Sequence, residues 1–373
     1  MKIRRSRLFW VVAVCVVLVV ALGVAGSIAL GRPDVQAMLA RNAFRRSIAK
    51  AAERRVMVDQ KVLRVVLCGT ASPLPNRERA GPCAAILVEG RVFVVDAGGG
   101  GIRNLLLWQI PADRISAVFL THFHSDHIED LGEINLQSWG QGRAERLPVY
   151  GGPGVETVAG GFQAAYTLDE SYRMAHHGAA LMNPDLFPMT PMVVAHDDGT
   201  ALEEGETRKV FERDGLTVTA IGVNHAPVKP AYGYRFDYGG RSIVISGDTK
   251  TSPALAVAAK GTDVLVHEAQ AQELLSIIHD EMLAVGNDRM AHIMADIPSY
   301  HTSPVDAARI ANAAGAKLLV MTHLTPPMPS WLAERVFMTG VDAVRPTGTR
   351  VGHDGLMISL PANSAEIQVE DLN

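Results

Sequence analysis

Residues 121–127 read Thr-His-Phe-His-Ser-Asp-His, and they directly follow a short apolar run typical of a buried strand. Four metal-ligating side chains therefore fall within six residues. In an extended segment His122 and His124 point to the same side, because side chains alternate between the two faces of a strand. A helical turn after them returns Asp126 and His127 to a neighbouring point. This spacing favours two adjacent metal ions over a solvated polar loop.

Three further candidate ligands stand where other strand-like runs end. They are His225 after residues 216–221, Asp248 after 242–245 and His323 after 318–321. Ligand sites of α/β folds gather at the carboxyl ends of strands, where loops carry chemistry on a rigid scaffold. We therefore predict a binuclear site whose ligands divide as follows: His122, His124 and His225 on one ion, Asp126, His127 and His323 on the other, and Asp248 as the bridging carboxylate.

These ligand types also suggest the metal and the chemistry. Imidazole and carboxylate ligands suit zinc, and manganese or iron accepts much the same donors. We therefore expect two Zn²⁺ ions as the cofactor. Two ions about 3.5–4 Å apart can hold a hydroxide between them at neutral pH and polarise the oxygen of the electrophile. The predicted chemistry is hydrolysis.

Short apolar runs bounded by Gly, Pro and Asn predict the strands of the fold. They lie at residues 62–68, 84–88, 91–95, 117–120, 216–221, 242–245, 264–266 and 318–321. Helical patterns fall between several of them, notably at 304–316, which predicts an α/β fold with covered sheets. Residues 160–212, rich in Met, Pro, His and Asp, are expected to form an irregular insertion.

Composition and charge restrict the class of protein. With 373 residues, 48% of them hydrophobic and 20% charged, the chain is globular, and collagen-like or wholly disordered proteins are excluded. The net charge of −4 combines a basic arm, residues 1–60 with 11 Lys/Arg and 3 Asp/Glu, with an acidic body, residues 61–373 with 24 and 36. Nucleic-acid binding depends on Lys and Arg that neutralise phosphates, so this body is a poor match for it.

The three cysteines are too few for a disulfide scaffold. Cys15 lies in an apolar run, so Cys68 and Cys83 are the one conceivable pair, and no other feature of the sequence favours a bridge between them. We therefore expect no disulfide.

Residues 8–31 contain no charged side chain, and about 20 apolar residues suffice to cross a bilayer. We expect an uncleaved transmembrane helix rather than a cleavable signal peptide, whose apolar region is about 7–15 residues long. Basic residues flank the run on both sides, so they do not decide its orientation. A short basic tail before a first apolar segment resembles a signal anchor, which places the catalytic domain outside the cytoplasm, in the periplasm. Residues 32–60 are expected to form a basic helical stalk.

The body of the chain resembles the metallo-β-lactamase-fold hydrolases, in the branch that contains ribonuclease Z and the zinc arylsulfatases. Besides the histidine motif, the resemblance is carried by residues 69–73, 79–82, 96–98, 247–249, 266–269, 300–303 and 321–323, within a span of 62–360. It implies an αβ/βα sandwich with the metal ions at one edge of the paired sheets. The predicted domains are a basic tail with a transmembrane anchor (1–31), the stalk (32–60), a metallo-β-lactamase-like hydrolase domain (61–361) and a polar tail (362–373).

The same resemblance implies roles for individual residues. Asp126 binds metal and orients the attacking hydroxide, and His301, from a His-Thr-Ser motif, donates a proton to the leaving group. From the residues alone, His301 is better explained as part of a helix start. Asp96 is implied to brace the metal loop, whereas His267 and Glu268 are equally well explained by buried structural hydrogen bonds.

Three functions compete. We favour a membrane-anchored zinc hydrolase of a small sulfate or phosphate ester, because residues 79–82 and 168–173 resemble the arylsulfatases. The alternative is a ribonuclease Z-like endonuclease that matures tRNA 3′ ends. The acidic body, the anchor and the 23 positions between His225 and Asp248, too few for a protruding arm, argue against it. A binding module with an inactive metal site is disfavoured by the full ligand set, and a β-lactamase proper by the bridging aspartate.

These arguments also decide the expected partners. We expect a small-molecule ester as the substrate and the membrane as a partner through the N-terminal helix. Nucleic acid is not expected as a partner. The sequence leaves the oligomeric state open, with a homodimer among the alternatives.

Overall fold

A computed structural model describes residues 9–12, 14, 15, 18, 27, 30–328 and 330–373 of the chain. The chain divides into two compact units, Met1–Arg54 and Arg55–Asn373. Helix α2 (Pro33–Val58) begins in the first unit. The second unit contains both sheets and every predicted site residue, so the fold that positions the site is the fold of this unit.

The transmembrane helix predicted at residues 8–31 is corrected. Most of that segment lies outside the described residues, and among the described ones no helix is long and apolar enough to cross a membrane. Helix α2 has sufficient length, with 26 residues, but charged side chains such as Arg41, Arg46 and Lys50 recur along it. The periplasmic location and the membrane partner were predicted from the transmembrane helix, and they are corrected with it.

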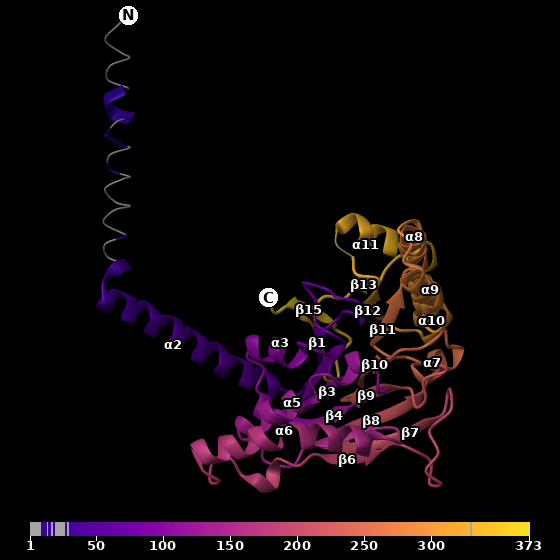
Figure 1. Ribbon diagram of the computed structural model, residues 1–373, viewed down its shortest axis with the longest axis horizontal. Helices are drawn as coiled ribbons and strands as arrows, with labels where there is room; N and C mark the ends of the chain where they lie inside the picture. The colour runs from indigo at the N-terminus through magenta and orange to yellow at the C-terminus, as the bar shows by residue number, and fades with distance from the viewer. Residues whose placement is uncertain (1–8, 13, 16–17, 19–26, 28–29, 329) are drawn as a thin grey trace, which may run out of the picture. The chain divides into compact units, whose positions relative to one another are not determined.

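The described residues form two mixed sheets that face each other in the second unit (Figure 1). The first sheet has the strand order β15-β14-β1-β2-β3-β4-β5-β6. Its strands are β1 (Val62–Gly69), β2 (Cys83–Val88), β3 (Arg91–Val95), β4 (Ile115–Phe119), β5 (Pro148–Gly151), β6 (Thr190–Val193), β14 (Leu356–Pro361) and β15 (Gln368–Asp371). Strand β15 forms part of the predicted polar tail and pairs with β14.

The second sheet has the strand order β13-β12-β11-β10-β9-β8-β7. Its strands are β7 (Thr207–Arg213), β8 (Leu216–Gly222), β9 (Tyr232–Tyr238), β10 (Arg241–Ile245), β11 (Val264–Gln270), β12 (Leu318–Thr325) and β13 (Thr349–Val351). Strands β3 to β6 run parallel in the first sheet, as do β10 to β13 in the second. The loops that follow parallel strands emerge at a common edge, which is where ligand sites form.

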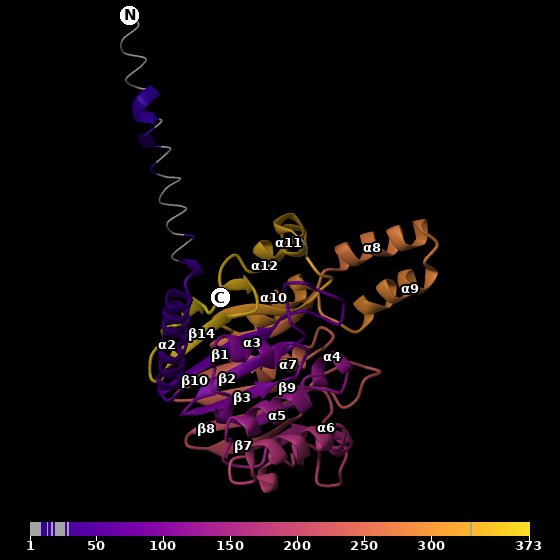
Figure 2. The ribbon, with the colours of Figure 1, turned by 60° about the vertical axis from the view of Figure 1, so that its left-hand side comes forward.

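Helices cover the outer faces of both sheets. The helices that follow α2 in the chain are α3 (Gly101–Leu107), α4 (Ser125–Ile128), α5 (Leu131–Gly140), α6 (Val155–His177), α7 (Pro253–Ala258), α8 (Gln272–Ala284), α9 (Asp288–Asp296), α10 (Pro304–Ala314), α11 (Trp331–Phe337) and α12 (Val341–Val344). Short 3₁₀ turns lie at Ala112–Arg114, Pro184–Leu186 and Ile297–Ser299. Helices α8 and α9 form a hairpin that projects from the sandwich (Figure 2).

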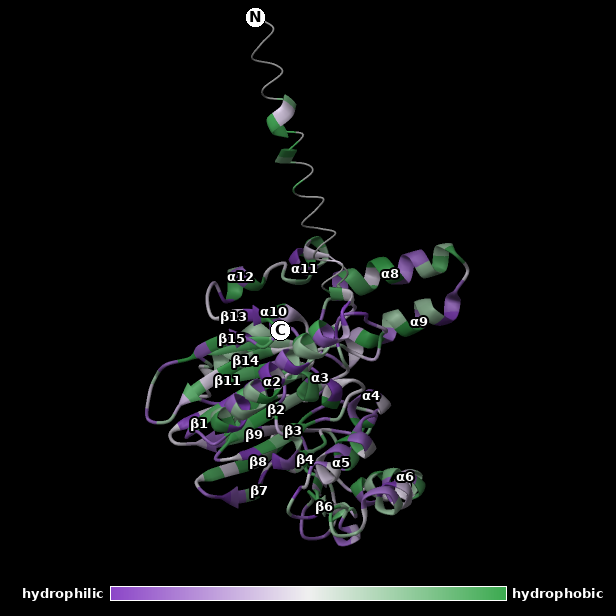
Figure 3. Cartoon of the chain, turned by 90° about the vertical axis from the view of Figure 1, so that its left-hand side faces the viewer, coloured by the Kyte–Doolittle hydropathy of each residue, from purple (hydrophilic) through white to green (hydrophobic). Residues whose placement is uncertain are grey.

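The inner strands of both sheets are buried on both faces because each sheet is covered twice, whereas edge strands such as β7 and β15 are largely exposed. Side chains of both sheets, including Phe93, Phe119 and Phe236, meet in a core between them. A second core lies between the first sheet and helices α3, α5 and α6, and a third lies between the second sheet and helices α7 and α10. The strands are accordingly coloured mainly as hydrophobic in Figure 3. This arrangement confirms the predicted αβ/βα sandwich.

The prediction of an irregular insertion at residues 160–212 is wrong for its first part. Helix α6 occupies Val155–His177 and is followed by β6 and β7. Within it the buried side chains are Val155 and Ala159 near its start. Because so little of the helix is buried, its sequence lacks the continuous apolar stripe that would have predicted it.

The expectation of no disulfide is also wrong, because Cys68 and Cys83 are bonded with their Cα atoms 5.0 Å apart. Strands β1 and β2 are antiparallel neighbours, and their register shifts between Leu67 and Gly69. This bulge places Cys68 beside Cys83, the first residue of β2. A sequence pattern does not reveal a register shift, so the pairing could not be predicted.

Asp263 provides a test of how the second sheet is held together. It is 3% exposed and accepts hydrogen bonds from Arg241 at 3.0 Å and from the Ser242 amide at 2.9 Å. Replacement by asparagine leaves the buried charge of Arg241 without its carboxylate partner, so we expect a loss of about 3–5 kcal/mol in the free energy of unfolding at pH 7, measured in urea. Glu212→Gln, at an exposed ion pair with Lys209, should change it by less than about 0.5 kcal/mol.

The pH dependence of this effect follows from the pKa of Asp263. Burial raises that pKa, but the hydrogen bonds from Arg241 and Lys317 outweigh burial and lower it. A carboxyl whose pKa is lower in the folded state stabilises the fold above its unfolded pKa of about 3.9 and ceases to do so as pH falls through its folded pKa. The difference between wild type and Asp263→Asn should therefore shrink below about pH 4. A constant difference down to pH 2 would contradict this assignment.

Candidate metal centre

The histidine motif follows β4 on a backbone fixed by Asp96, which comes directly after β3. One Asp96 oxygen accepts a hydrogen bond from the Thr121 amide at 2.8 Å, and the other accepts one from the Thr121 hydroxyl at 2.9 Å. The second oxygen also lies 2.9 Å from Nδ1 of His127. This carboxylate therefore joins the start of the motif to helix α4 and braces the loop between them.

The other predicted ligands come from the second sheet. His225 follows β8, Asp248 follows β10, and His323 lies within β12. Gly247 makes the turn that brings Asp248 to the site: its φ is 61°, and a Cβ there would lie 2.3 Å from the Tyr232 carbonyl oxygen. A glycine is needed at this close approach of two backbones. The ends of strands from both sheets thus meet at one edge.

The structure brings all seven predicted metal ligands together. Their potential ligand atoms form two groups, within each of which the atoms lie no more than 4.8 Å apart. The first group is His122, His124, His225 and Asp248, and the second is Asp126, His127 and His323. His124 is exposed, whereas His122, His225 and Asp248 are buried. A molecule in solution therefore reaches the centre from the side of His124.

A single oxygen of Asp248 lies between the two groups. Oδ2 is 3.8 Å from His122 Nε2 and 3.9 Å from His225 Nε2, which belong to the first group. It is 3.4 Å from His127 Nε2 and 3.3 Å from His323 Nε2, which belong to the second. Four imidazole nitrogens, two from each group, thus surround this one carboxylate oxygen. The position is suited to a carboxylate that bridges two cations.

Hydrogen bonds orient three of the imidazoles toward the centre. His127 donates from Nδ1 to Asp96, and Nδ1 of His225 donates to the Tyr300 carbonyl oxygen at 3.0 Å. Nδ1 of His122 lies 3.0 Å from the Thr121 hydroxyl, whose own proton goes to Asp96. Nε2 of each ring thereby faces the centre, where that of His122 also lies 2.9 Å from His124 Nδ1, and this is the usual orientation of metal-bound histidine.

The protonation states also suit metal ligands. Burial lowers the pKa of His122 well below its ordinary value. Burial raises the pKa of Asp248, but the neighbouring His323 and His127 outweigh it and bring that pKa well below its usual range. Burial lowers the pKa of His127, but Asp248 and Asp96 outweigh burial and raise it well above its ordinary value. The ring therefore holds a proton that a bound cation would displace.

Buried atoms of the predicted ligands that lack hydrogen-bond partners also fit a pair of metal ions. Within the described part of the chain, five buried atoms of the predicted ligands have no hydrogen-bond partner: Nδ1 of His323 and four atoms that face the centre, namely Asp126 Oδ2, His127 Nε2, His225 Nε2 and His323 Nε2. Buried polar atoms are normally satisfied, and each unsatisfied one costs about 1–3 kcal/mol. Four such atoms converging on one point are explained when cations complete their coordination.

His301 lies beside the two groups and is held by Glu268. Its Nδ1 is 3.2 Å from Glu268 Oε1, and its ring centre is 5.2 Å from that of His225 and 5.4 Å from that of His323. Burial lowers the pKa of His301, but the charge of Glu268 and their hydrogen bond outweigh burial and raise it to about 9. His301 is therefore a protonated group at neutral pH.

The sequence did not reveal that Glu268 holds His301 in this site. It is 1% exposed, and one of its oxygens also accepts hydrogen bonds from the Thr302 and Thr249 amides. The available signal was its position in β11, whose end lies at the same edge as the ends of β10 and β12. That signal does not identify His301, 33 residues later, as its partner.

The amino-acid sequence matches a known family. Residues 91–324 match the Beta-lactamase superfamily domain. A protein named ribonuclease Z from Mycobacterium bovis is 35% identical over 268 residues, covering 71% of this chain and 87% of its own length. A ribonuclease Z from Mycobacterium marinum is 34% identical over 269 residues, with the same shares of both chains covered.

Solved structures agree on the fold. The metallo-beta-lactamase fold protein YhfI from Bacillus subtilis has a TM-score of 0.55 and 18% identity, and it covers 80% of this chain and 99% of its own. The short form of human tRNase Z has a TM-score of 0.54 and 21% identity, with the same coverage. At such identities the likeness concerns the fold alone, and it confirms the resemblance drawn from the sequence.

The relatives overturn the expected substrate. Proteins named ribonuclease Z are nucleases, so the prediction of a small-molecule ester as substrate, with no nucleic-acid partner, is corrected. The arylsulfatase-like interpretation has no support from these relatives. The physical reason is that the net charge of a domain averages over its whole surface, whereas a polyanion responds to the charges near its binding site.

Proposed function

The chain belongs to the beta-lactamase superfamily, and from that premise we propose that it is a ribonuclease Z-like enzyme that cleaves phosphodiester bonds of RNA with two zinc ions. It is a metal-dependent hydrolase that acts on ester bonds. The finer points, namely the RNA substrate, the zinc pair and the residue roles, are our proposal. They are supported by the relatives at 35% identity and by the geometry of the centre.

The observation that carries the proposal is the position of Asp248. Its Oδ2 lies within 3.9 Å of four histidine nitrogens from two ligand groups. His122, His124 and His225 would hold one ion, Asp126, His127 and His323 the other, and Asp248 both. Two ions held by these residues would supply Lewis acidity that activates a nucleophile and stabilises charge on the phosphoryl oxygens.

The protein's own residues supply the remaining chemistry. Asp126 has a pKa that burial raises but the neighbouring His323 and His127 lower, so it is a carboxylate that can accept a hydrogen bond from the attacking water. His301 carries a proton at neutral pH and would donate it to the departing ribose oxygen. Glu268 keeps that proton on His301. The exposed edge at His124 admits the substrate.

Cleavage of an RNA precursor tests this proposal. Full-length protein loaded with zinc or manganese should cleave a tRNA precursor that carries a 3′ extension, in low salt where electrostatic binding is strongest. Asp126→Ala should abolish the cleavage and so exclude a contaminating nuclease. A zinc-loaded protein that hydrolyses a chromogenic sulfate ester but leaves the precursor intact would refute the proposed substrate.

A further inference from the structure

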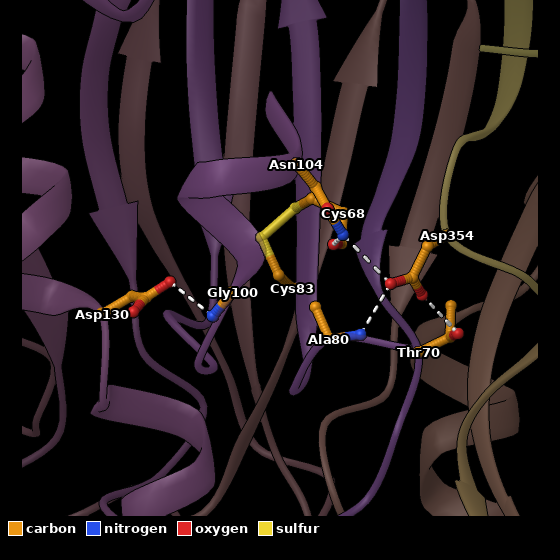
Figure 4. Close-up of a disulfide and its surroundings, with 8 residues drawn as sticks. All are labelled: Cys68, Thr70, Ala80, Cys83, Gly100, Asn104, Asp130 and Asp354. Atoms are coloured by element: carbon orange, nitrogen blue, oxygen red, sulfur yellow. Dashed lines mark hydrogen bonds between the residues drawn. A yellow bond between two sulfur atoms is a disulfide. The ribbon is translucent and has the colours of Figure 1, made fainter. Parts of the chain in front are cut away.

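The Cys68–Cys83 disulfide closes a loop formed by residues 69–82, which we name the disulfide loop (Figure 4). Both cysteines are buried, with 0% and 4% of their surface exposed. Thiol–disulfide exchange requires access for an attacking thiolate, so the folded protein protects this bond. The bond is therefore a lasting constraint on the two ends of the disulfide loop.

One end of the disulfide loop contacts the strand that carries His323. The Leu324 amide donates a hydrogen bond to the Thr70 carbonyl oxygen at 2.9 Å, and Ala71 pairs with Leu324 in a parallel bridge. His323 directly precedes Leu324 and has a φ of 49°. Residues other than glycine keep such a conformation only when their surroundings hold it. The disulfide loop is part of those surroundings.

The other end of the disulfide loop is linked to the segment that carries Asp126 and His127 through Ala97 and Gly98. Gly98 donates to the Pro82 carbonyl oxygen at 2.9 Å, and the amide before Gly98 donates to the His127 carbonyl oxygen at 2.7 Å. A Cβ on Gly98 would lie 2.3 Å from the Gly81 carbonyl carbon and 2.6 Å from the Asp126 carbonyl oxygen. Three backbones therefore touch here with no side chain between them, and a shift of one displaces the others.

Asp354 fixes the disulfide loop between these two ends (Figure 4). Its carboxylate accepts hydrogen bonds from the Ala80 amide at 2.6 Å, the Thr70 hydroxyl at 2.7 Å and the Asn104 side chain at 3.1 Å. Asn104 also donates to the Cys68 carbonyl oxygen at 2.8 Å. The disulfide and the carboxylate thus restrain the same loop from two sides.

The first ligand group has other supports. His122 is held by Thr121, and His225 is held by the Tyr300 carbonyl oxygen. The disulfide loop approaches this group through Leu74, which packs on the same hydrophobic cluster as Tyr300. That contact involves side-chain packing alone, whereas the loop reaches the second group through backbone hydrogen bonds, directly at Leu324 and by way of Ala97 and Gly98 at His127. Cys83 also lines a cavity of ≈ 30 Å³ shared with His127, Asp248 and His323.

We propose that the Cys68–Cys83 disulfide positions the second ligand group, Asp126, His127 and His323, so that without it the protein keeps one metal ion and binds the other weakly. The bond acts through the backbone of the disulfide loop and touches neither metal nor substrate, so the cysteines are positioning residues. This inference depends on the two-metal part of the proposed function, and it adds to that function a structural control of one of the two sites.

Calorimetric zinc titration of the full-length chain tests the inference without measuring activity. His225→Ala identifies the binding phase of the first group, and His323→Ala identifies that of the second. In Cys68→Ala/Cys83→Ala we expect the zinc affinity of the second phase to fall by about tenfold or more, which is the usual effect of losing residues that support metal ligands. The affinity of the first phase should change by less than about threefold. The disulfide is removed by substitution and not by a reductant, because reduction would leave thiolates that themselves bind zinc.

Two further variants keep the test decisive. Cys15→Ser is the matched cysteine control and should leave both phases unchanged. Asp354→Asn keeps the disulfide but removes part of the restraint on the disulfide loop, so it should also lower the zinc affinity of the second ligand group. If wild type shows two binding phases and the double cysteine variant weakens both equally, or weakens neither, this inference is overturned and the two-metal proposal stands. A wild-type chain that never binds more than one ion would overturn the two-metal proposal as well.

Discussion

Replacement of Asp248 by alanine is expected to weaken the binding of both metal ions and to abolish hydrolysis. Its Oδ2 is the atom that approaches histidines of both ligand groups, at 3.3–3.9 Å. Loss of an outer-shell partner lowers metal affinity by about 10–100-fold, so loss of a shared ligand should exceed 100-fold. Metal content after dialysis at fixed free zinc, together with the rate of RNA cleavage, measures both effects.

His323→Ala is the matched comparison for this prediction. His323 belongs to the second group alone, so its loss should release one ion and leave the first group occupied. Both side chains are 3% exposed, which makes the two substitutions comparable in burial. If both variants lose one ion and retain the other equally well, Asp248 is a ligand of one site and does not bridge.

The sequence predicted the placement of these ligands because their spacing obeys simple geometry. His122 and His124 are two residues apart after β4, and Asp126 and His127 follow in the next helical turn. Of the other candidates, His225 follows β8, Asp248 follows β10 and His323 lies near the end of β12. Strands that are apolar on both faces were recognisable as continuous runs, and they did form the covered sheets of the sandwich. Such features depend on local periodicity, which a sequence displays directly.

Features that depend on tertiary register were not predictable. The disulfide needs a bulge between Leu67 and Gly69 that sets Cys68 beside Cys83. The pairing of Glu268 with His301 needs the loop after α9 to return to the end of β11. Both pairs are brought together by long-range packing. No pattern within either segment records its partner.

Substrate class was mispredicted for a different reason. The excess of acidic residues over 61–373 is real, but it describes the average surface of the domain. A metal pair changes the local charge at the site by about four units when both ions are divalent, and a phosphodiester responds to this local charge. The relatives at 35% identity therefore carry more weight than the charge count.

His301→Ala is expected to retain both metal ions and to lower turnover by about 10²–10⁴-fold, the usual contribution of general acid catalysis. A ligand atom of the ring lies within 4.8 Å of those of Asp248 and His323, but the ring is held by Glu268 and all seven proposed ligands remain without it, so both metal ions should stay bound. The loss should be greatest for RNA, whose leaving ribose oxygen needs a proton. It should be least for a nitrophenyl phosphodiester, whose leaving group departs unaided.

Glu268→Gln separates this role from a structural one. Glu268 raises the pKa of His301 to about 9 against the effect of burial, and activity that needs the protonated ring is lost as pH rises through that pKa. Removal of the charge should lower the pKa of His301, so the basic limb of the pH–rate profile should move to lower pH while metal content stays at two ions. If His301→Ala slows RNA and nitrophenyl diester equally, and Glu268→Gln leaves the basic limb in place, His301 supports the loop before α10 and donates no proton.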